Sequence, residues 1–330
     1  MIDLSFEIRR IKMALPGIEL DYVNSYVVKS GDEIAIIDDG MYFLDNLRLL
    51  MRELKSMNLS VNKIDKVIGT HFHVDHITLT PAINDLASPE FYIGEKDYKI
   101  ISNDVEKFLS STLSLYAQNG TPKELVERIL KEHPLMRNKR IYEEMRNLDW
   151  RKLSDGSEIK VGDIIFKVLE VPGHTPGHVI LEANEIAFTG DHILPKITPN
   201  IPQYPVEEKS AVTYYINSLV KTMESKVTKG YPGHGDQIDS LPSRINQLLQ
   251  HHNERLSEVL GLMKKDECVT AFELAQKIKW NLSKPFADMS STNKFFAIGE
   301  TISHLYNLEE NGKVERKERD NITCWKLISP

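Results

Sequence analysis

The residues best suited to chemistry in this chain lie in one short stretch, Thr70-His-Phe-His-Val-Asp-His76. It places His71, His73, Asp75 and His76 between an apolar strand and a segment that can form a helix. Imidazole nitrogens combined with a carboxylate are ligands that suit zinc and similar divalent metals. The alternative is a His-rich loop tip without a metal. We favour the metal site because the rest of the chain supplies matching partners.

Three further polar clusters also follow expected strands and sit beside glycines. They are Gly173-His-Thr-Pro-Gly-His178, Gly190-Asp-His192 and Gly233-His-Gly235. Glycine allows the backbone to approach a ligand closely or to turn sharply. A single Gly-His-Gly is usually only a turn, but four clusters in order at strand ends indicate one shared site. The candidate ligands from these clusters are His174, Asp191 and His234.

The elements that must position these residues follow an α/β pattern. Apolar alternation predicts two strands within residues 19–38, and apolar spacing predicts a helix over 43–56. Strands are expected at 65–70 and 90–94, at 153–159, 164–171 and 178–182, and at 185–188, with a helix at 208–225. Residues 95–149 interrupt the strands as a helical insertion, with helices at 103–118, 121–133 and 138–146. This insertion is either a lid over the site or a packing element.

Together these motifs resemble the metallo-β-lactamase superfamily of hydrolases over roughly residues 20–240. The resemblance implies an α/β fold, an αββα sandwich with a helical insertion, and two divalent metal ions. Zinc is the expected metal, with iron and manganese as alternatives. The resemblance assigns His71, His73 and His174 to one metal and Asp75, His76 and His234 to the other, with Asp191 bridging both. Asp38 and His178 are expected to support the ligands from behind.

The resemblance also implies a chemistry, namely attack by a hydroxide that bridges the two metals on a carbonyl or phosphoryl centre. Asp75 is expected to orient this hydroxide. For His192 two roles stay open: action on the substrate or leaving group, or a core position. Some family activities fit less well, since Leu194 stands where homoserine-lactone lactonases carry Tyr, and His73 stands where oxygen-reducing di-iron members carry Glu. Thioesterases of the glyoxalase II type share the ligand set.

The last part of the chain, residues 246–330, predicts a small domain separate from a catalytic domain at 1–245. Helices are expected at 245–264, 270–278 and 294–307, followed by a hairpin about Asp320-Asn321. Three helices and a hairpin are typical of a winged helix, a fold that often binds DNA. However, residues 246–330 carry 12 basic and 12 acidic residues, which gives no electrostatic footprint for nucleic acid. We therefore expect a packing or homodimer interface, and keep a DNA-binding regulator as the alternative.

The composition of all 330 residues indicates a water-soluble globular protein, with 41% hydrophobic and 27% charged residues and a net charge of −7. The sequence shows neither an apolar run of membrane-spanning length nor a signal peptide. The two cysteines, Cys268 and Cys324, are expected to be reduced thiols, because a chain of this size does not need a disulfide. These features predict a cytoplasmic protein without a membrane partner.

The substrate class must be judged from the surroundings of the metals, because ester and phosphodiester hydrolysis can use the same ligands. Residues 193–200 and Tyr204 predict an apolar wall with few polar anchors, which suits a small ester or thioester. A phosphodiesterase or ribonuclease is the alternative, but it needs a basic channel. Arg137-Asn-Lys-Arg140 is a local basic run that fits either an anionic head group or a solvated surface.

Overall fold

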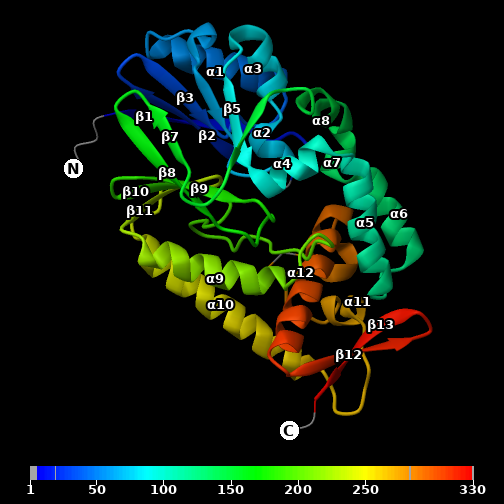
Figure 1. Cartoon of the computed structure of the whole chain (residues 1–330). Helices are drawn as coiled ribbons and strands as arrows, with labels where there is room; N and C mark the ends of the chain where they lie inside the picture. The colour runs from blue at the N-terminus through cyan, green and yellow to red at the C-terminus, as the bar shows by residue number, and fades with distance from the viewer. Residues whose placement is uncertain (1–5, 19, 282–283, 329–330) are drawn as a thin grey trace.

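The structure, a computed structural model, describes residues 6–18, 20–281 and 284–328. Two β-sheets lie face to face between two layers of helices (Figure 1). The first sheet contains, in spatial order, β1 (Glu7–Ala14), β2 (Tyr22–Ser30), β3 (Glu33–Ile37), β4 (Lys66–Ile68), β5 (Glu90–Gly94) and β6 (Trp150–Leu153). The second contains β11 (Lys229–Pro232), β10 (Ile186–Gly190), β9 (Val179–Ala183), β8 (Ile164–Glu170) and β7 (Glu158–Val161).

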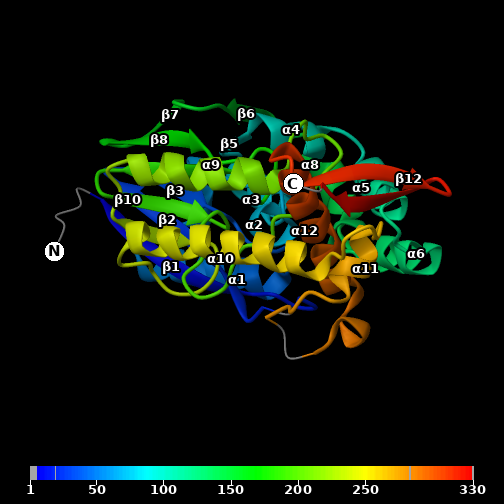
Figure 2. The ribbon, with the colours of Figure 1, turned by 90° about the horizontal axis from the view of Figure 1, so that it is seen from below.

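The outer helical layers complete the predicted αββα sandwich. Helices α1 (Leu44–Ser56) and α3 (Thr80–Ala87) cover the first sheet, and α9 (Ala211–Glu224) and α10 (Leu241–Leu262) cover the second. Figure 2, seen from below, shows α9 and α10 side by side across the second sheet. The αββα sandwich expected from the sequence is therefore confirmed.

Strand β3 shows why the sequence builds three apolar layers. Ile34 and Ile36 face the helices on the outside, whereas Ala35 and Ile37 belong to the core between the sheets. A strand that is buried on both faces carries a continuous apolar run rather than an alternating one. The same logic applies on the other side, where Leu219 of α9 packs on the outer face of the second sheet.

The strand directions bring the polar clusters to one edge of the sandwich. β3, β4, β5 and β6 run parallel, and β10 runs parallel to β11. Parallel neighbours end at the same edge of a sheet, which is where α/β proteins place ligands. The loops that follow β4, β10 and β11 therefore open at a common edge.

The insertion is helical, as predicted, and the three expected helices are confirmed to within two residues. Two further helices, α4 (Glu95–Ser102) and α7 (Pro134–Arg137), were not predicted. The insertion contains α4 (Glu95–Ser102), α5 (Val105–Gln118), α6 (Lys123–Glu132), α7 (Pro134–Arg137) and α8 (Lys139–Met145). The C-terminal part contains α11 (Ala271–Ala275), α12 (Ser291–Glu310), β12 (Val314–Arg319) and β13 (Ile322–Leu327).

The C-terminal part does not have a core of its own. Leu113 and Tyr116 of the insertion share one apolar cluster with Leu274, Phe295 and Trp325 of the C-terminal part. In addition, the predicted boundary at 245/246 falls inside the continuous helix α10. The predicted order of three helices and a hairpin is confirmed, and the turn residues Asp320 and Asn321 both have positive φ. The winged-helix assignment itself stays a prediction.

Three expectations from the sequence need correction. The strand expected at 153–159 does not exist as one element, because residues 154–157 connect β6 of the first sheet to β7 of the second. Strand β1 was not anticipated, although it pairs with β2 along its whole length. The expectation of two reduced thiols is wrong, because Cys268 and Cys324 form a disulfide. Val269 and Trp325 pair as a β-bridge, which brings the adjacent cysteines together. The two cysteines are 56 residues apart in the sequence, and no local pattern predicts that they pair.

Among the described residues, no helix has the length and apolar character that crossing a membrane requires. Two expectations fall partly outside the described ranges. The absence of a signal peptide concerns a start that includes residues 1–5, and the first expected strand begins at residue 19.

The shared core predicts that Gly299→Ala destabilises the protein by about 1–3 kcal/mol, the usual cost of overpacking. A Cβ on Gly299 of α12 would overlap the hydroxyl of Tyr116, whose side chain is fully buried. The matched control is Gly261→Ala in α10, where a Cβ meets nothing within 4 Å and helix propensity favours alanine. Urea unfolding measures both variants. Equal midpoints for the two would contradict a core shared by the insertion and the C-terminal part.

Candidate metal centre

All seven predicted ligands meet at the common edge of the two sheets. His71 and His73 follow β4, and Asp75 and His76 lie on the short helix α2 (Val74–Ile77). The remaining ligands come from the second sheet: His174 lies between β8 and β9, Asp191 follows β10, and His234 follows β11. Loops from both sheets therefore converge on one buried cluster.

The first group consists of three imidazoles. His73 Nδ1 lies 3.1 Å from His71 Nε2 and 3.0 Å from His174 Nε2. All the candidate ligand atoms of this group lie within 4.8 Å of one another. Three ring nitrogens that point at a common centre are the arrangement expected of a three-histidine metal site.

The second group combines a carboxylate with two imidazoles. Asp75 Oδ2 lies 3.3 Å from His234 Nε2 and 3.7 Å from His76 Nε2. Asp191 lies between the two groups: its Oδ1 is 3.6 Å from His76 Nε2, and its Oδ2 is 3.5 Å from His234 Nε2 and 3.7 Å from His174 Nε2. Asp191 is thus placed to bridge two ions.

Four of the imidazoles are held from behind by their Nδ1 atoms. His76 Nδ1 bonds to Asp38 Oδ2 at 2.9 Å, and His71 Nδ1 bonds to the hydroxyl of Thr70 at 3.0 Å. His174 and His234 bond to the backbone oxygens of Asn200 at 2.7 Å and of Tyr22 at 2.8 Å. Such contacts fix the ring orientation and leave Nε2 free to bind a metal.

Unsatisfied buried atoms show that the cluster fits divalent ions. Among the described residues, His76 Nε2, His234 Nε2 and Asp191 Oδ1 are buried without a hydrogen-bond partner. Leaving such polar atoms unpaired costs roughly 1–3 kcal/mol each. A cation between them would satisfy all three atoms, so the donor set present here is suited to metal binding.

Metal binding requires neutral imidazole and ionised carboxylate, and the pKa shifts of His71 and Asp75 favour these forms, whereas the shift of His76 favours a protonated ring until a cation takes the place of its proton. Burial, together with the neighbouring imidazoles, holds the pKa of His71 well below its usual range. Burial opposes ionisation of Asp75, but His76 and His234 outweigh it and lower the Asp75 pKa to about 2. Burial likewise opposes protonation of His76, yet the carboxylates around it raise its pKa.

The predicted supporting residues lie behind the ligands. Asp38 accepts hydrogen bonds from the backbone N–H of Thr70 at 2.7 Å and from the Thr70 hydroxyl at 2.9 Å, in addition to its contact with His76. His178 stacks on His71 with 4.8 Å between ring centroids, and its Nε2 accepts a hydrogen bond from the backbone N–H of Asp191 at 3.1 Å. Both residues therefore contact candidate ligands from behind, as the sequence led us to expect.

For His192, the structure supports the core position and not the catalytic role. The side chain is fully buried, packs on Tyr215, and its Nε2 contacts the Thr222 hydroxyl at 3.2 Å. It does not line the cavity described below. Burial lowers the pKa of His192 to about 3. Of the two roles left open by the sequence, the core position is therefore favoured over action on the substrate or leaving group.

Sequence reasoning missed Asp97, which ties two ligand loops together. Its carboxylate accepts hydrogen bonds from the backbone N–H of Phe72 at 3.0 Å, from the hydroxyl of Thr175 at 2.7 Å and from the backbone N–H of Gly177 at 2.6 Å. Gly177 is required because a Cβ there would collide with Asp97. No motif in the sequence marks Asp97, which lies in the first turn of α4, apart from the ligand motifs.

A cavity of about 690 Å³ opens from the metal centre. Its lining includes five of the ligands, namely His73, Asp75, His174, Asp191 and His234. The predicted wall is confirmed in part: Leu194, Lys196–Asn200 and Tyr204 line the cavity, whereas Ile193 is buried against α9 and α10. Residues 132–135 and Arg137 of the insertion form another wall.

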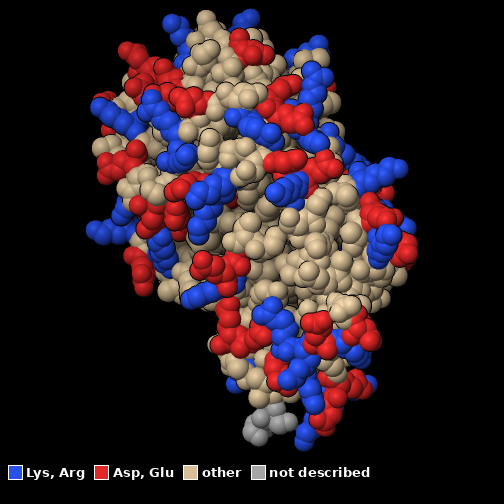
Figure 3. All heavy atoms as spheres, turned by 45° about the vertical axis from the view of Figure 1, so that its right-hand side comes forward, with Lys and Arg blue, Asp and Glu red and all other residues tan. Residues whose placement is uncertain are grey.

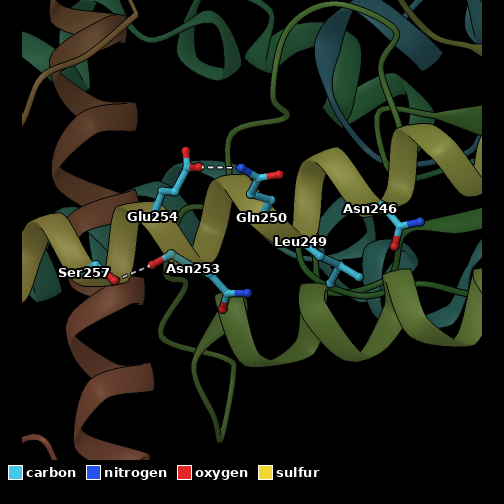
Figure 4. A pocket seen from close by; sticks show the side chains of 6 residues that line it. All are labelled: Asn246, Leu249, Gln250, Asn253, Glu254 and Ser257. Carbon is cyan, nitrogen blue, oxygen red and sulfur yellow. Dashed lines mark hydrogen bonds between the residues drawn. The ribbon is translucent and has the colours of Figure 1, made fainter.

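A second hollow lies on the outer face of α10 and is lined by six residues of that helix (Figure 4). Within it Gln250 donates to Glu254, and Ser257 donates to the backbone oxygen of Asn253. None of its six lining residues belongs to the metal cluster. The chemistry therefore lies in the larger cavity.

Known proteins with similar sequences cover nearly the whole chain. The probable metallo-hydrolase YqjP of Bacillus subtilis (strain 168) is 27% identical over 315 residues, which cover 92% of this chain and 92% of that protein. The beta-lactamase-like protein 2 homolog of Caenorhabditis elegans is 24% identical over 316 residues, covering 94% and 87% respectively.

Solved structures share the whole architecture, including the C-terminal part. A metallo-beta-lactamase family protein from Thermus thermophilus matches with a TM-score of 0.78 at 23% identity, covering 97% of this chain and 98% of that one. A beta-lactamase domain protein from Burkholderia ambifaria matches with a TM-score of 0.80 at 21% identity, covering 97% and 92%. A family model described as the metallo-beta-lactamase superfamily matches residues 18–234. This match spans well over half of the chain, and the protein therefore belongs to the metallo-beta-lactamase superfamily.

Proposed function

We propose that this protein is a hydrolase that uses two divalent metal ions to cleave a small carbonyl ester or thioester. Water adds across the acyl bond and releases a carboxylic acid and an alcohol or thiol. The observation that carries the proposal is the convergence of seven candidate ligand residues, five of which line a largely apolar cavity. The resemblance to a protein named a probable metallo-hydrolase supports the general class.

The residues divide into two half-sites. His71, His73 and His174 would hold one ion, Asp75, His76 and His234 the other, and Asp191 would join them. When bound, two such ions lower the pKa of a water molecule and polarise the oxygen that is attacked. Zinc suits these ligands, and iron or manganese are alternatives.

Asp75 has the position and charge of a residue that orients the attacking water. It borders the cavity and is also held 3.3 Å from His234 Nε2. With a pKa of about 2 it is ionised at neutral pH, so it accepts hydrogen bonds. Asp75 can therefore accept a hydrogen bond from the water, which turns a lone pair of the water oxygen toward the substrate.

The cavity walls favour a small and largely apolar substrate. Apolar side chains come from several separate parts of the chain, among them the β1–β2 connection, the insertion, the loop after β10, and α12. They include Ile18, Leu20, Leu135, Leu194, Ile197, Tyr204, Phe295 and Phe296. A concave site of this volume with mostly apolar walls is typical of small-molecule binding. The insertion contributes a wall in the observed state; its movement as a lid stays a prediction.

A phosphodiesterase or ribonuclease activity is the second candidate, and the charge distribution supports it less. The cavity is lined by the cations Arg137, Lys196 and Arg255, but also by Glu132 and Glu300 in addition to the ligand carboxylates. On the face shown in Figure 3, Lys and Arg are interspersed with Asp and Glu, and a broad uncharged stretch lies between them. That face lacks the continuous basic track that single-stranded nucleic acid requires.

DNA binding through the C-terminal part is disfavoured by the burial of its third helix. Helix α12 buries 13 of its 20 residues and packs against α6, α9, α10 and α11. A recognition helix must present an open face to the major groove. We therefore propose that the C-terminal part packs on the catalytic site. The homodimer and the cytoplasmic location remain predictions.

Metal analysis tests the two half-sites. We expect about two divalent ions per chain after reconstitution, as measured by elemental analysis. Asp191→Ala should lose metal and activity together, because one carboxylate serves both ions. The matched control is Asp236→Ala, whose carboxylate is exposed and pairs with Arg10. A wild-type content that stays at one ion or none would count against the dinuclear site.

A substrate panel tests the reaction class. The metal-loaded protein should hydrolyse short-chain thioesters or aryl esters. Asp75→Asn should lower kcat by at least about 10²-fold, the usual scale for a group that manages protons, with metal content measured in parallel. Cleavage of single-stranded RNA without activity on any carbonyl ester would reverse the ranking in favour of a phosphodiesterase.

A further inference from the structure

Arg255 is a buried cation in the wall of the metal-centre cavity that no step of the proposed reaction uses. It lies on α10 and is only 6% exposed. Trp280, Asn281 and the first residues of α12 line the same part of the cavity. The C-terminal part of the chain therefore places one positive charge in the space that a substrate would occupy.

The guanidinium of Arg255 is fixed along one side. Its Nη1 donates to Glu258 Oε2 at 2.6 Å and to the backbone oxygen of Lys279 at 3.1 Å. The planar group also lies over the ring of Trp280, 4.8 Å from the ring centroid. Arginine that is stacked and anchored in this way loses little further freedom when it binds a ligand.

The opposite edge of the guanidinium lacks an acceptor among the described residues. Nε is buried without a hydrogen-bond partner, and Nη2 makes no hydrogen bond to any residue in the described ranges. The Nε and Nη2 hydrogens point in parallel, which matches the two oxygens of a carboxylate. A buried charged donor without an acceptor is costly, so this edge is suited to an acceptor supplied by a ligand.

The surrounding charges indicate a monoanion. Glu300 lines the same cavity but forms no ion pair with Arg255; its Oε2 instead accepts a hydrogen bond from Asn200 at 3.1 Å. The cation Arg137 lies beside Gly17 in the cavity wall, since a Cβ added to Gly17 would be 3.9 Å from Arg137 Nη1. Because the charge of Arg255 is already partly balanced by Glu258, a carboxylate is balanced better here than a phosphate dianion.

We propose that Arg255 binds a carboxylate of the substrate, at the end remote from the acyl bond that is cleaved. The substrate class is then the monoester or monothioester of a dicarboxylic acid. The identity of the cleaved bond rests on the proposed function, but the binding of a carboxylate at Arg255 does not. The apolar walls between the two ends accommodate the methylene chain that links them.

Kinetics with two matched substrates tests this specificity. The p-nitrophenyl monoester of adipic acid carries a distal carboxylate, and p-nitrophenyl hexanoate has a methyl group in its place. Arg255→Gln should raise KM for the adipate monoester by about 10-fold to 100-fold, the range expected for a charged hydrogen bond, and leave kcat within a factor of about three. The same variant should leave the hexanoate parameters unchanged. Equal effects on both substrates would overturn the proposal.

Equilibrium binding separates this proposal from the proposed function. Calorimetry on the metal-loaded protein should show adipate binding that weakens at least about 10-fold in Arg255→Gln. Arg140→Gln, at an exposed residue paired only with Glu144, is the control and should bind like the wild type. Adipate binding that depends on Arg255 in a protein without esterase activity would refute the function and retain the site. Equal adipate affinity in wild type and Arg255→Gln would refute the site.

Two further arms keep the outcome decisive. Arg255→Lys retains the positive charge but removes the pair of parallel N–H donors. It covers the case in which Arg255→Gln fails to fold, and we expect it to bind adipate more weakly than the wild type. Inorganic phosphate serves as the competing anion. Phosphate binding that is tighter than adipate binding and is lost in Arg255→Lys would assign the site to phosphate and overturn the carboxylate assignment.

Discussion

The structure depends on the need to keep a cluster of buried imidazoles and carboxylates in one arrangement. Without such support these groups would turn toward solvent or lose their charge, because burying an unpaired polar atom costs free energy. Here four of the rings are fixed through their Nδ1 atoms by groups from separate parts of the chain, such as Asp38 and the backbone oxygen of Tyr22. Their Nε2 atoms and the carboxylates of Asp75 and Asp191 are then left to face a shared centre. The two sheets serve to bring these loops to the same edge.

The C-terminal part takes part in the same constraint. Asn200 connects it to the metal centre, because its backbone oxygen holds His174 and its side chain donates to Glu300 of α12. The backbone N–H of Gln203 donates to the oxygen of Gly299, so α12 positions the loop that carries Asn200. The apolar cluster shared with the insertion joins these elements on one side of the cavity. The helical additions thus shape the site that the sandwich creates.

Much of the fold and the ligand set could be predicted from the sequence, because closely spaced histidines and strand-end glycines are local signals. The run from His71 to His76 and the apolar strands, such as residues 33–37, are of this kind. What escaped prediction depends on contacts between distant segments. Asp97 has no motif, and its role appears only when Phe72 and Gly177 are brought beside it. The pairing of Cys268 with Cys324 and the edge of Arg255 that lacks an acceptor among the described residues are likewise set by the packing of the C-terminal part.

The central claim is that Asp191 joins two metal ions held by six other residues. Anomalous diffraction from crystals of the metal-loaded protein, recorded at the absorption edge of the bound metal, tests it most directly. The account predicts two peaks, each about 2.0–2.2 Å from its histidine and carboxylate ligand atoms, with an oxygen of Asp191 in contact with each ion. A single peak, or two peaks of which one does not touch Asp191, would contradict it.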